Sequence, residues 1–111
     1  NLPYIVVDDG ASGFRPAWIM FKNISSSGYG WSIFDVVREA SDGNPNSTAL
    51  NASGTGGDSS VASYQHDILA NGFKIRGTSG ETNGNGNTII YLAFAEHPFG
   101  GSGVAQAKTR S

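Results

Sequence analysis

The chain has 111 residues, of which 38% are hydrophobic and 14% are charged, and its formal net charge is −2. This length fits one domain with one modest core, and the low charge content excludes a disordered polyelectrolyte. The net charge supplies no basic surface for a nucleic acid or an anionic membrane, and no apolar run approaches the roughly 20 residues of a membrane helix. We therefore expect no nucleic-acid partner and no membrane insertion.

The composition favours strands and turns over helices. Sixteen glycines, together with many Ser and Asn residues, disfavour helix interiors, while the β-branched and aromatic clusters are typical of strands. The chain contains no cysteine, so packing and assembly must supply the stability that disulfides would otherwise give. We expect a single all-β domain over residues 1–111, an antiparallel β-sandwich of jelly-roll-like form. Because the chain begins with Asn1, we expect it to be a fragment, a processed product or the ordered end of a longer protein.

The first half of the chain predicts three strands. "YIVV" (residues 4–7) is a short apolar run before a turn, and we expect a first or edge strand. "FRPAWIMFKN" (residues 14–23) is the next strong run, in which Pro16 limits pairing at the start. It is separated by a Ser- and Gly-rich loop from "WSIFDVV" (residues 31–37), and this spacing predicts a hairpin.

The second half begins with a segment of low apolar content, residues 39–60, which predicts a long loop. Residues 64–77 predict two short strands that are broken at Asn71-Gly72. "GETNGNG" (residues 80–86) predicts a hairpin connection into the last strand, "NTIIYLAFAEHP" (residues 87–98). The tail, residues 98–111, is expected to be irregular.

Two of these strands have no polar face. A half-exposed strand alternates apolar with polar residues, yet in "AWIMF" one face carries Trp18 and Met20 and the other carries Ile19 and Phe21. In "IIYLAFA" the two faces are residues 89, 91, 93 and 95 against residues 90, 92 and 94. The second face could be covered by the long loops, by the rest of a longer polypeptide or by copies of the same domain. We expect a homo-oligomer, preferably a trimer, and we expect the last strand to lie deepest.

Motifs for metal binding are incomplete. "DGNPNSTALNAS" (residues 42–53) begins with the D-x-N-x-N spacing of a calcium loop. It has Ser47 where the motif needs glycine and Ser53 where it needs glutamate, and Pro45 stiffens the segment. We expect an Asn- and Asp-rich turn here, with no metal and no cofactor.

Enzymatic motifs are equally weak, and we expect no enzyme. His66 and Asp67 are adjacent, so on a strand their side chains point to opposite faces, and no nucleophile elbow is present. Four carboxylates lie near the ends of the expected strands: Asp35, Glu39, Asp67 and Glu96. A glycosidase would need two of them in one cleft, but a local Asp35–Arg38 ion pair, or a Glu96 that accepts backbone hydrogens, explains them more simply.

Aromatic residues beside polar loops are the remaining candidates for binding. Tyr29 and Trp31 flank Gly30 at a junction of loop and strand, while Tyr64 and His66 border the Gly- and Ser-rich loop. An aromatic ring provides a stacking surface for a sugar, and nearby amides and carboxylates bind its hydroxyls. We therefore name Tyr29, Trp31, Tyr64 and His66 as candidate ligand-binding residues. The alternative is that Trp31 caps the core and Tyr29 is a turn residue.

An ordered series of motifs resembles a known family. The segments "GFRPAWIMFKN", "WSIFDVVR", "DILANGFKIRGT" and "NGNTIIYLAFAEHPF" are similar to a domain of unknown function that recurs near the C-terminus of phage structural proteins. The resemblance spans Phe14 to Phe99. The chain departs from the pattern at Ile89, where tyrosine is usual, and at "GTGGDSS", where an Ala-Glu pair is common.

The resemblance implies a non-enzymatic virion component on the surface of an extracellular particle. It implies the distal, receptor-binding domain of a β-rich, commonly trimeric tail fibre or similar appendage. Its loops, residues 42–60 and 77–87, would then touch a host surface polysaccharide. The alternative is a capsid decoration or connector that contacts only other virion proteins. A glycan-degrading tailspike is disfavoured, because no catalytic carboxylate pair is evident.

Overall fold

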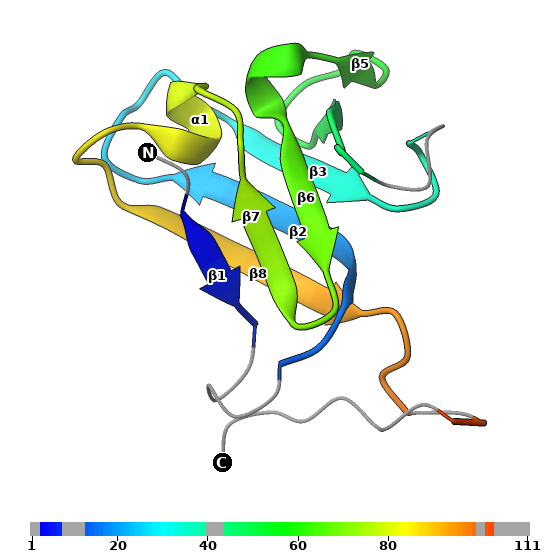
Figure 1. The fold of residues 1–111 in the computed structure, drawn as a ribbon. Helices are drawn as coiled ribbons and strands as arrows, with labels where there is room; N and C mark the ends of the chain where they lie inside the picture. The colour runs from blue at the N-terminus through cyan, green and yellow to red at the C-terminus, as the bar shows by residue number, and fades with distance from the viewer. Residues whose placement is uncertain (1–2, 8–12, 40–43, 100–101, 104–111) are drawn as a thin grey trace.

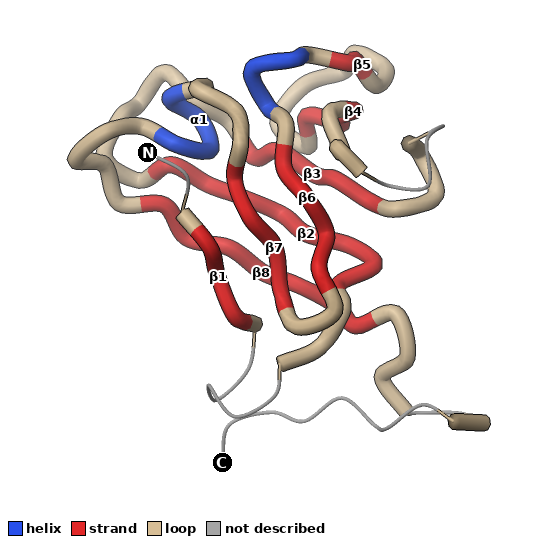
Figure 2. Tube along the Cα trace, in the orientation of Figure 1, coloured by secondary structure: helices blue, strands red, loops and turns tan. Residues whose placement is uncertain are grey.

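The computed structural model describes residues 3–7, 13–39, 44–99 and 102–103. Two antiparallel sheets pack face to face, and two short helical segments lie at one end of them (Figures 1 and 2). The smaller sheet has the order β1-β7-β6, with β1 at Tyr4–Val6, β6 at His66–Leu69 and β7 at Gly72–Ile75. The two sheets confirm the antiparallel β-sandwich.

The larger sheet has the order β5-β4-β3-β2-β8. Its strands are β2 (Pro16–Asn23), β3 (Trp31–Asp35), β4 (Thr48–Asn51), β5 (Ser59–Ser60) and β8 (Ile89–Ala95). The predicted hairpin is present, because β2 pairs with β3 in antiparallel register. β2 lies between β3 and β8 and pairs with both, next to the edge of the sheet.

The core lies between the two sheets. Phe21 packs edge-on against Phe34 of β3 and Phe73 of β7, with ring centroids 5.7 and 5.3 Å apart. Such tilted arrangements are the favoured geometry for aromatic pairs. The buried hydrophobic residues are Val7, Ile19, Phe21, Phe34, Ala49, Ile68, Phe73 and Ile75. Both sheets therefore contribute their inner faces to one core.

The sequence predicts that the last strand lies deepest in the domain, and this prediction is wrong. β8 lies at the edge of the five-stranded sheet and pairs only with β2 among the described strands. Its inner face, with Ile89 and Ala93, packs on the core, but Ile90, Leu92 and Phe94 are exposed on the other face. A strand with two apolar faces can occupy any place in a sheet, so the pattern alone did not determine the strand order.

The segment after β7 is also different from the expectation. Residues 80–86 do not connect a hairpin, because β7 and β8 belong to different sheets. Instead, Gly80–Asn83 forms the short helix α1, whose first turn is capped by Ser79 Oγ, which accepts a hydrogen bond from Glu81 N. The side chain of Asn23 fixes this helix to β2, since its Nδ2 donates to Gly80 O at 2.6 Å.

Smaller differences concern the loops. The expected long loop contains β4 and β5, and a one-turn 3-10 helix at Ala62–Tyr64 follows it. Residues 40–43 of that loop lie outside the described residues. The β6–β7 hairpin is present as expected, but its turn is at Ala70-Asn71, one residue before the expected pair. In the tail, Pro98, Phe99, Ser102 and Gly103 are in turns, and the other residues beyond 99 lie outside the described part.

Candidate interaction surface

The outward side of the five-stranded sheet carries apolar side chains in successive rows. The register of β2 with β8 places Trp18 beside Phe94 and Met20 beside Leu92. The register of β2 with β3, and of β3 with β4, continues the Leu92–Met20 row through Ile33 to Leu50. We call this surface the outer face, and it consists of Trp18, Met20, Trp31, Ile33, Leu50, Ile90, Leu92 and Phe94. Four adjacent strands therefore present apolar side chains where a solvated sheet would present polar ones.

The outer face is most exposed along β8. Ile90, Leu92 and Phe94 are 43%, 48% and 57% exposed, whereas the residues on β2, β3 and β4 are only half-buried by their neighbours. Trp18 and Phe94 pack against each other at 5.3 Å between ring centroids. Contiguous exposed apolar patches of this kind are uncommon on monomers and mark interaction sites.

Two charged residues lie among these rows, and both are engaged within the chain. Lys22 lies between Ile90 and Trp31, and its Nζ donates to Tyr29 O. Asp35 pairs with Arg38 at 2.9 Å, as expected from the sequence, and it accepts hydrogen bonds from backbone N–H groups of residues 37 and 38. Hydrogen bonds to Asp35 and then Asp58 raise the pKa of Arg38. Both charged groups therefore have hydrogen-bond partners within the chain.

The free edge of β8 adjoins this face. Within the described residues, β8 has a hydrogen-bonded neighbour on one side only. The unpaired N–H and C=O groups of an edge strand are a ready template for pairing with another chain. The outer face and the β8 edge therefore form one continuous surface with the chemical character of an interface.

The four candidate ligand-binding residues do not form one platform. Trp31 points to the outer face, whereas the next residue, Ser32, is buried on the inner face. Tyr29 lies beside α1, where a side chain at Gly80 would collide with the Tyr29 ring. Tyr64 is half-buried and packs edge-on against Phe34 at 6.1 Å. A ligand contact by Tyr29 or Trp31 stays a prediction.

His66 lies in the core, so it cannot contribute to a surface site in this conformation. It is 0% exposed, and its ring packs edge-on against Phe34 at 4.7 Å and Phe21 at 6.0 Å. Burial lowers the pKa of His66 to about 4, despite a contact of Nδ1 with Tyr64 O at 3.2 Å. Nε2 has no hydrogen-bond partner among the described residues. The imidazole is therefore a neutral core group at physiological pH.

A buried carboxylate that sequence reasoning missed explains the position of Tyr64. Glu81 is 7% exposed and accepts hydrogen bonds from Ser32 Oγ and, at 2.9 Å, from Tyr64 Oη. Burial, and then the hydrogen bond to Glu81, raise the pKa of Tyr64. The signal in the sequence is Ser79, a good helix cap, just before Gly-Glu-Thr. This cluster joins α1, β3 and the 3-10 helix.

The carboxylates considered for catalysis each have a structural partner. The partners of Asp35 are given above. Glu39 accepts hydrogen bonds from Ser47 N at 2.7 Å and from Thr48 N at 3.0 Å. The hydrogen bond from Ser47 is the main cause of the lowered pKa of Glu39. Asp67 pairs with Arg76, and Glu96 pairs with Arg15 at 3.2 Å. These ion pairs and backbone contacts hold loops and strand ends together.

The partial calcium motif is not assembled in the described part of the chain. Residues 48–51 form β4, so this stretch does not wrap around an ion, and residues 42 and 43 lie outside the described residues. Within the described ranges, no group of three or more His, Asp or Glu side chains could hold a metal ion. Likewise, none of the described helices is long and apolar enough to cross a membrane.

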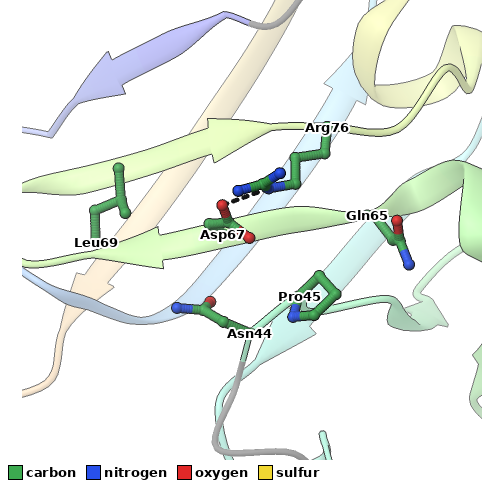
Figure 3. Close-up of a pocket in the computed structure, with 6 residues that line it drawn as sticks. All are labelled: Asn44, Pro45, Gln65, Asp67, Leu69 and Arg76. Carbon is green, nitrogen blue, oxygen red and sulfur yellow. Dashed lines mark hydrogen bonds and ion pairs between the residues drawn. The ribbon is translucent and has the colours of Figure 1, made fainter.

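Two hollows lie on the surface. One, of about 500 Å³, is lined by residues around the ion pair between Asp67 of β6 and Arg76, which follows β7 (Figure 3). Three of its polar side chains are bonded within the chain, because Asp67 pairs with Arg76 and Asn44 donates to and accepts from the backbone of Ile68 at 2.8 and 2.6 Å. The other, of about 310 Å³, lies between β1, β8 and the loop at residues 83–87.

Comparison with known proteins adds a family. A family model described as "Domain of unknown function (DUF7483)" matches residues 9–98, most of the chain. The chain belongs to the DUF7483 family. No curated protein and no solved structure gives a significant match to it. The match of the DUF7483 domain includes every element from β2 to β8, and therefore the outer face and both hollows in large part, but it leaves out β1.

Proposed function

We propose that this chain is a non-enzymatic structural module of a phage virion, which assembles with copies of itself through the outer face. The observation that carries the proposal is the outer face itself, with apolar residues on four adjacent strands and a free β8 edge beside it. The structural partners of Asp35, Glu39, Asp67 and Glu96 support the non-enzymatic part of the proposal.

A second copy of the chain is the occupant that suits this surface. Four strands about 4.8 Å apart and five residues at about 3.4 Å each give a face of roughly 300 Å² in projection. A stable interface buries about 800 Å² per partner, so the surroundings must contribute as well. Val37 and Phe99, which are 90% and 86% exposed, follow β3 and β8 at the Trp18 end of the sheet and extend the apolar surface there.

Self-assembly also explains why the charged residues are arranged as they are. Lys22 donates to a backbone carbonyl of its own chain and Asp35 pairs with Arg38, so a copy of the same surface would meet no charged group without a hydrogen-bond partner. We expect three copies, because the phage appendage proteins that the sequence resembles are commonly trimers. In this assembly the domain forms the distal, receptor-binding part of a tail fibre or similar appendage and contacts host surface glycans.

The position of the domain on the particle tests the proposal. Antibody fragments raised against the purified chain would be imaged on virions of the phage that encodes it. Labels confined to the tips of tail appendages are the expected result. Dense, regular labelling of the capsid would replace the appendage assignment with a decoration protein, and particles without any label would overturn the proposal of a virion component.

A further inference from the structure

The smaller hollow lies where the sandwich is open, and we call it the loop hollow. It lies between β1 and β8, which are edge strands of the two sheets, and the loop at residues 83–87 covers one end. Its volume of about 310 Å³ is at the small end of the range for ligand sites. The size suits one sugar ring better than a long chain.

One wall of the loop hollow is apolar and aromatic. Ile5, Phe73, Ile89 and Tyr91 line it. Tyr91 is held by an edge-to-face contact with Phe73 at 5.1 Å, yet it is still 42% exposed. An aromatic ring that is fixed in orientation and partly exposed is suited to stacking against the apolar face of a pyranose.

The opposite rim is polar and is held in place by its own hydrogen bonds. Asn85 and Asn87 are exposed at this rim and supply carboxamide groups, which can both donate to and accept from hydroxyls. Asn87 N donates to Gly84 O at 3.1 Å, and Gly86 has the φ angle of +74° that glycine tolerates best. Thr88 N donates to Ser25 Oγ at 2.7 Å and fixes the end of the loop.

Thr82 gives an independent indication of a missing partner. It lines the loop hollow and is 4% exposed, and its Oγ1 has no hydrogen-bond partner among the described residues. A buried hydroxyl without a partner is costly, and each such group in a native structure calls for an explanation. Rotation about χ1 can turn this hydroxyl toward a ligand in the hollow.

The residues that line the loop hollow carry no charge. They are Pro, Ile, Phe, Thr, Asn, Gly and Tyr residues, with no Asp, Glu, His, Lys or Arg among the described lining residues. A carboxylate or phosphate on the ligand would therefore find no cation, and an amine would find no anion. This favours a neutral, polyhydroxylated ligand over an acidic sugar.

We propose that the loop hollow binds a neutral pyranose, with Tyr91 as the stacking residue and with Asn85, Asn87 and Thr82 as the hydroxyl partners. This inference rests on the proposed function, because it names the class of glycan that the appendage contacts. It also places the binding site at residues other than Tyr29, Trp31, Tyr64 and His66, none of which lines the loop hollow.

Titration of the purified chain with sugars tests the inference. Glucose, galactose, mannose and N-acetylglucosamine would be added separately, with glucuronate and N-acetylneuraminate as acidic probes, while amide shifts are followed by NMR. At least one neutral sugar is expected to shift the amides of Gly84 and Gly86, and the acidic sugars are expected to bind more weakly. Tyr91→Leu keeps an apolar side chain but removes the ring, and it should weaken binding about tenfold.

Two further variants keep the test decisive if Tyr91→Leu does not fold. Thr82→Val preserves shape while removing the hydroxyl, and it should also weaken binding. His97→Gln, at an exposed position outside the hollow, should leave binding unchanged. The inference is overturned if no probe binds, if only acidic sugars bind, or if His97→Gln weakens binding as much as Thr82→Val does. A chain that assembles but binds no sugar would contradict this site alone, whereas a monomer that binds sugar would contradict only the proposed assembly.

Discussion

Both faces of the five-stranded sheet carry mostly apolar side chains, but their surroundings differ. The inner face, with Ile19, Phe21 and Phe34, is buried beneath the smaller sheet. The outer face offers Trp18, Met20, Leu92 and similar residues on the same strands, but nothing in the described part of the chain covers it. The difference shows that apolar residues alone do not define a core. An apolar face stabilises the monomer when another part of the same chain packs on it, and it stabilises an assembly when another copy does.

The largest difference between the faces is expected from truncating one aromatic ring on each. Phe34→Ala should lower the free energy of unfolding by about 3–5 kcal/mol, because it leaves a cavity in the core. Phe94→Ala should change the monomer by less than about 1 kcal/mol, since Phe94 is 57% exposed. Urea denaturation at protein concentrations low enough to keep the chain monomeric would measure both. Equal losses would show that the outer face is already covered within the monomer.

The pH dependence of stability tests whether His66 is shielded from water in the core. Burial lowers the pKa of His66 to about 4 in the folded state, against about 6.5 in the unfolded chain, so protonation favours unfolding. Stability should be fully present above pH 6.5 and fall by about 3 kcal/mol as the pH drops from 6.5 to 4. Glu39, whose pKa is lowered from an ordinary value of 4.5, adds losses at the acid end of this range and below it.

Urea denaturation across this pH range would measure the effect, with His97→Gln as the control, because His97 is exposed. The control should keep the full dependence, whereas His66→Gln should remove most of it. A flat profile in the wild type between pH 6.5 and 4 would mean that water reaches His66.

A smaller loss of stability is expected from a change in the buried cluster of Glu81, Ser32 and Tyr64. Tyr64→Phe removes one donor from the buried carboxylate of Glu81, which should cost about 1–3 kcal/mol of unfolding free energy. Tyr4→Phe is a matched control, because Tyr4 Oη donates to Asn71 Oδ1 at an exposed position and its loss should cost clearly less. Thermal denaturation followed by circular dichroism would compare the two, and equal shifts in Tm would contradict the structural role of Tyr64.

Much of this architecture was predictable from residue patterns. The alternation in "AWIMF" correctly placed Ile19 and Phe21 on one face and Trp18 and Met20 on the other, because side chains on a strand alternate. It could not place β8 at an edge, since strand order depends on pairing between distant segments and both faces of β8 are apolar.

The candidate site was harder to predict for a related reason. Trp31 and His66 both appear beside polar loops in the sequence, but pairing places one on the outer face and the other in the core. The burial of Glu81 depends on Ser32 and Tyr64, which are 49 and 17 residues away in the chain. Such long-range partners leave no local signal beyond the helix cap at Ser79.

The claim that the outer face is an interface between copies is tested most directly by the oligomeric state. Sedimentation velocity of the purified chain would be compared with that of Leu92→Glu, which places a charge at the centre of the exposed row without touching the core. The wild type is expected to assemble at micromolar concentration, with three copies as the expected stoichiometry, and the folded variant is expected to be monomeric. A wild-type chain that is a stable, soluble monomer at these concentrations would contradict the account.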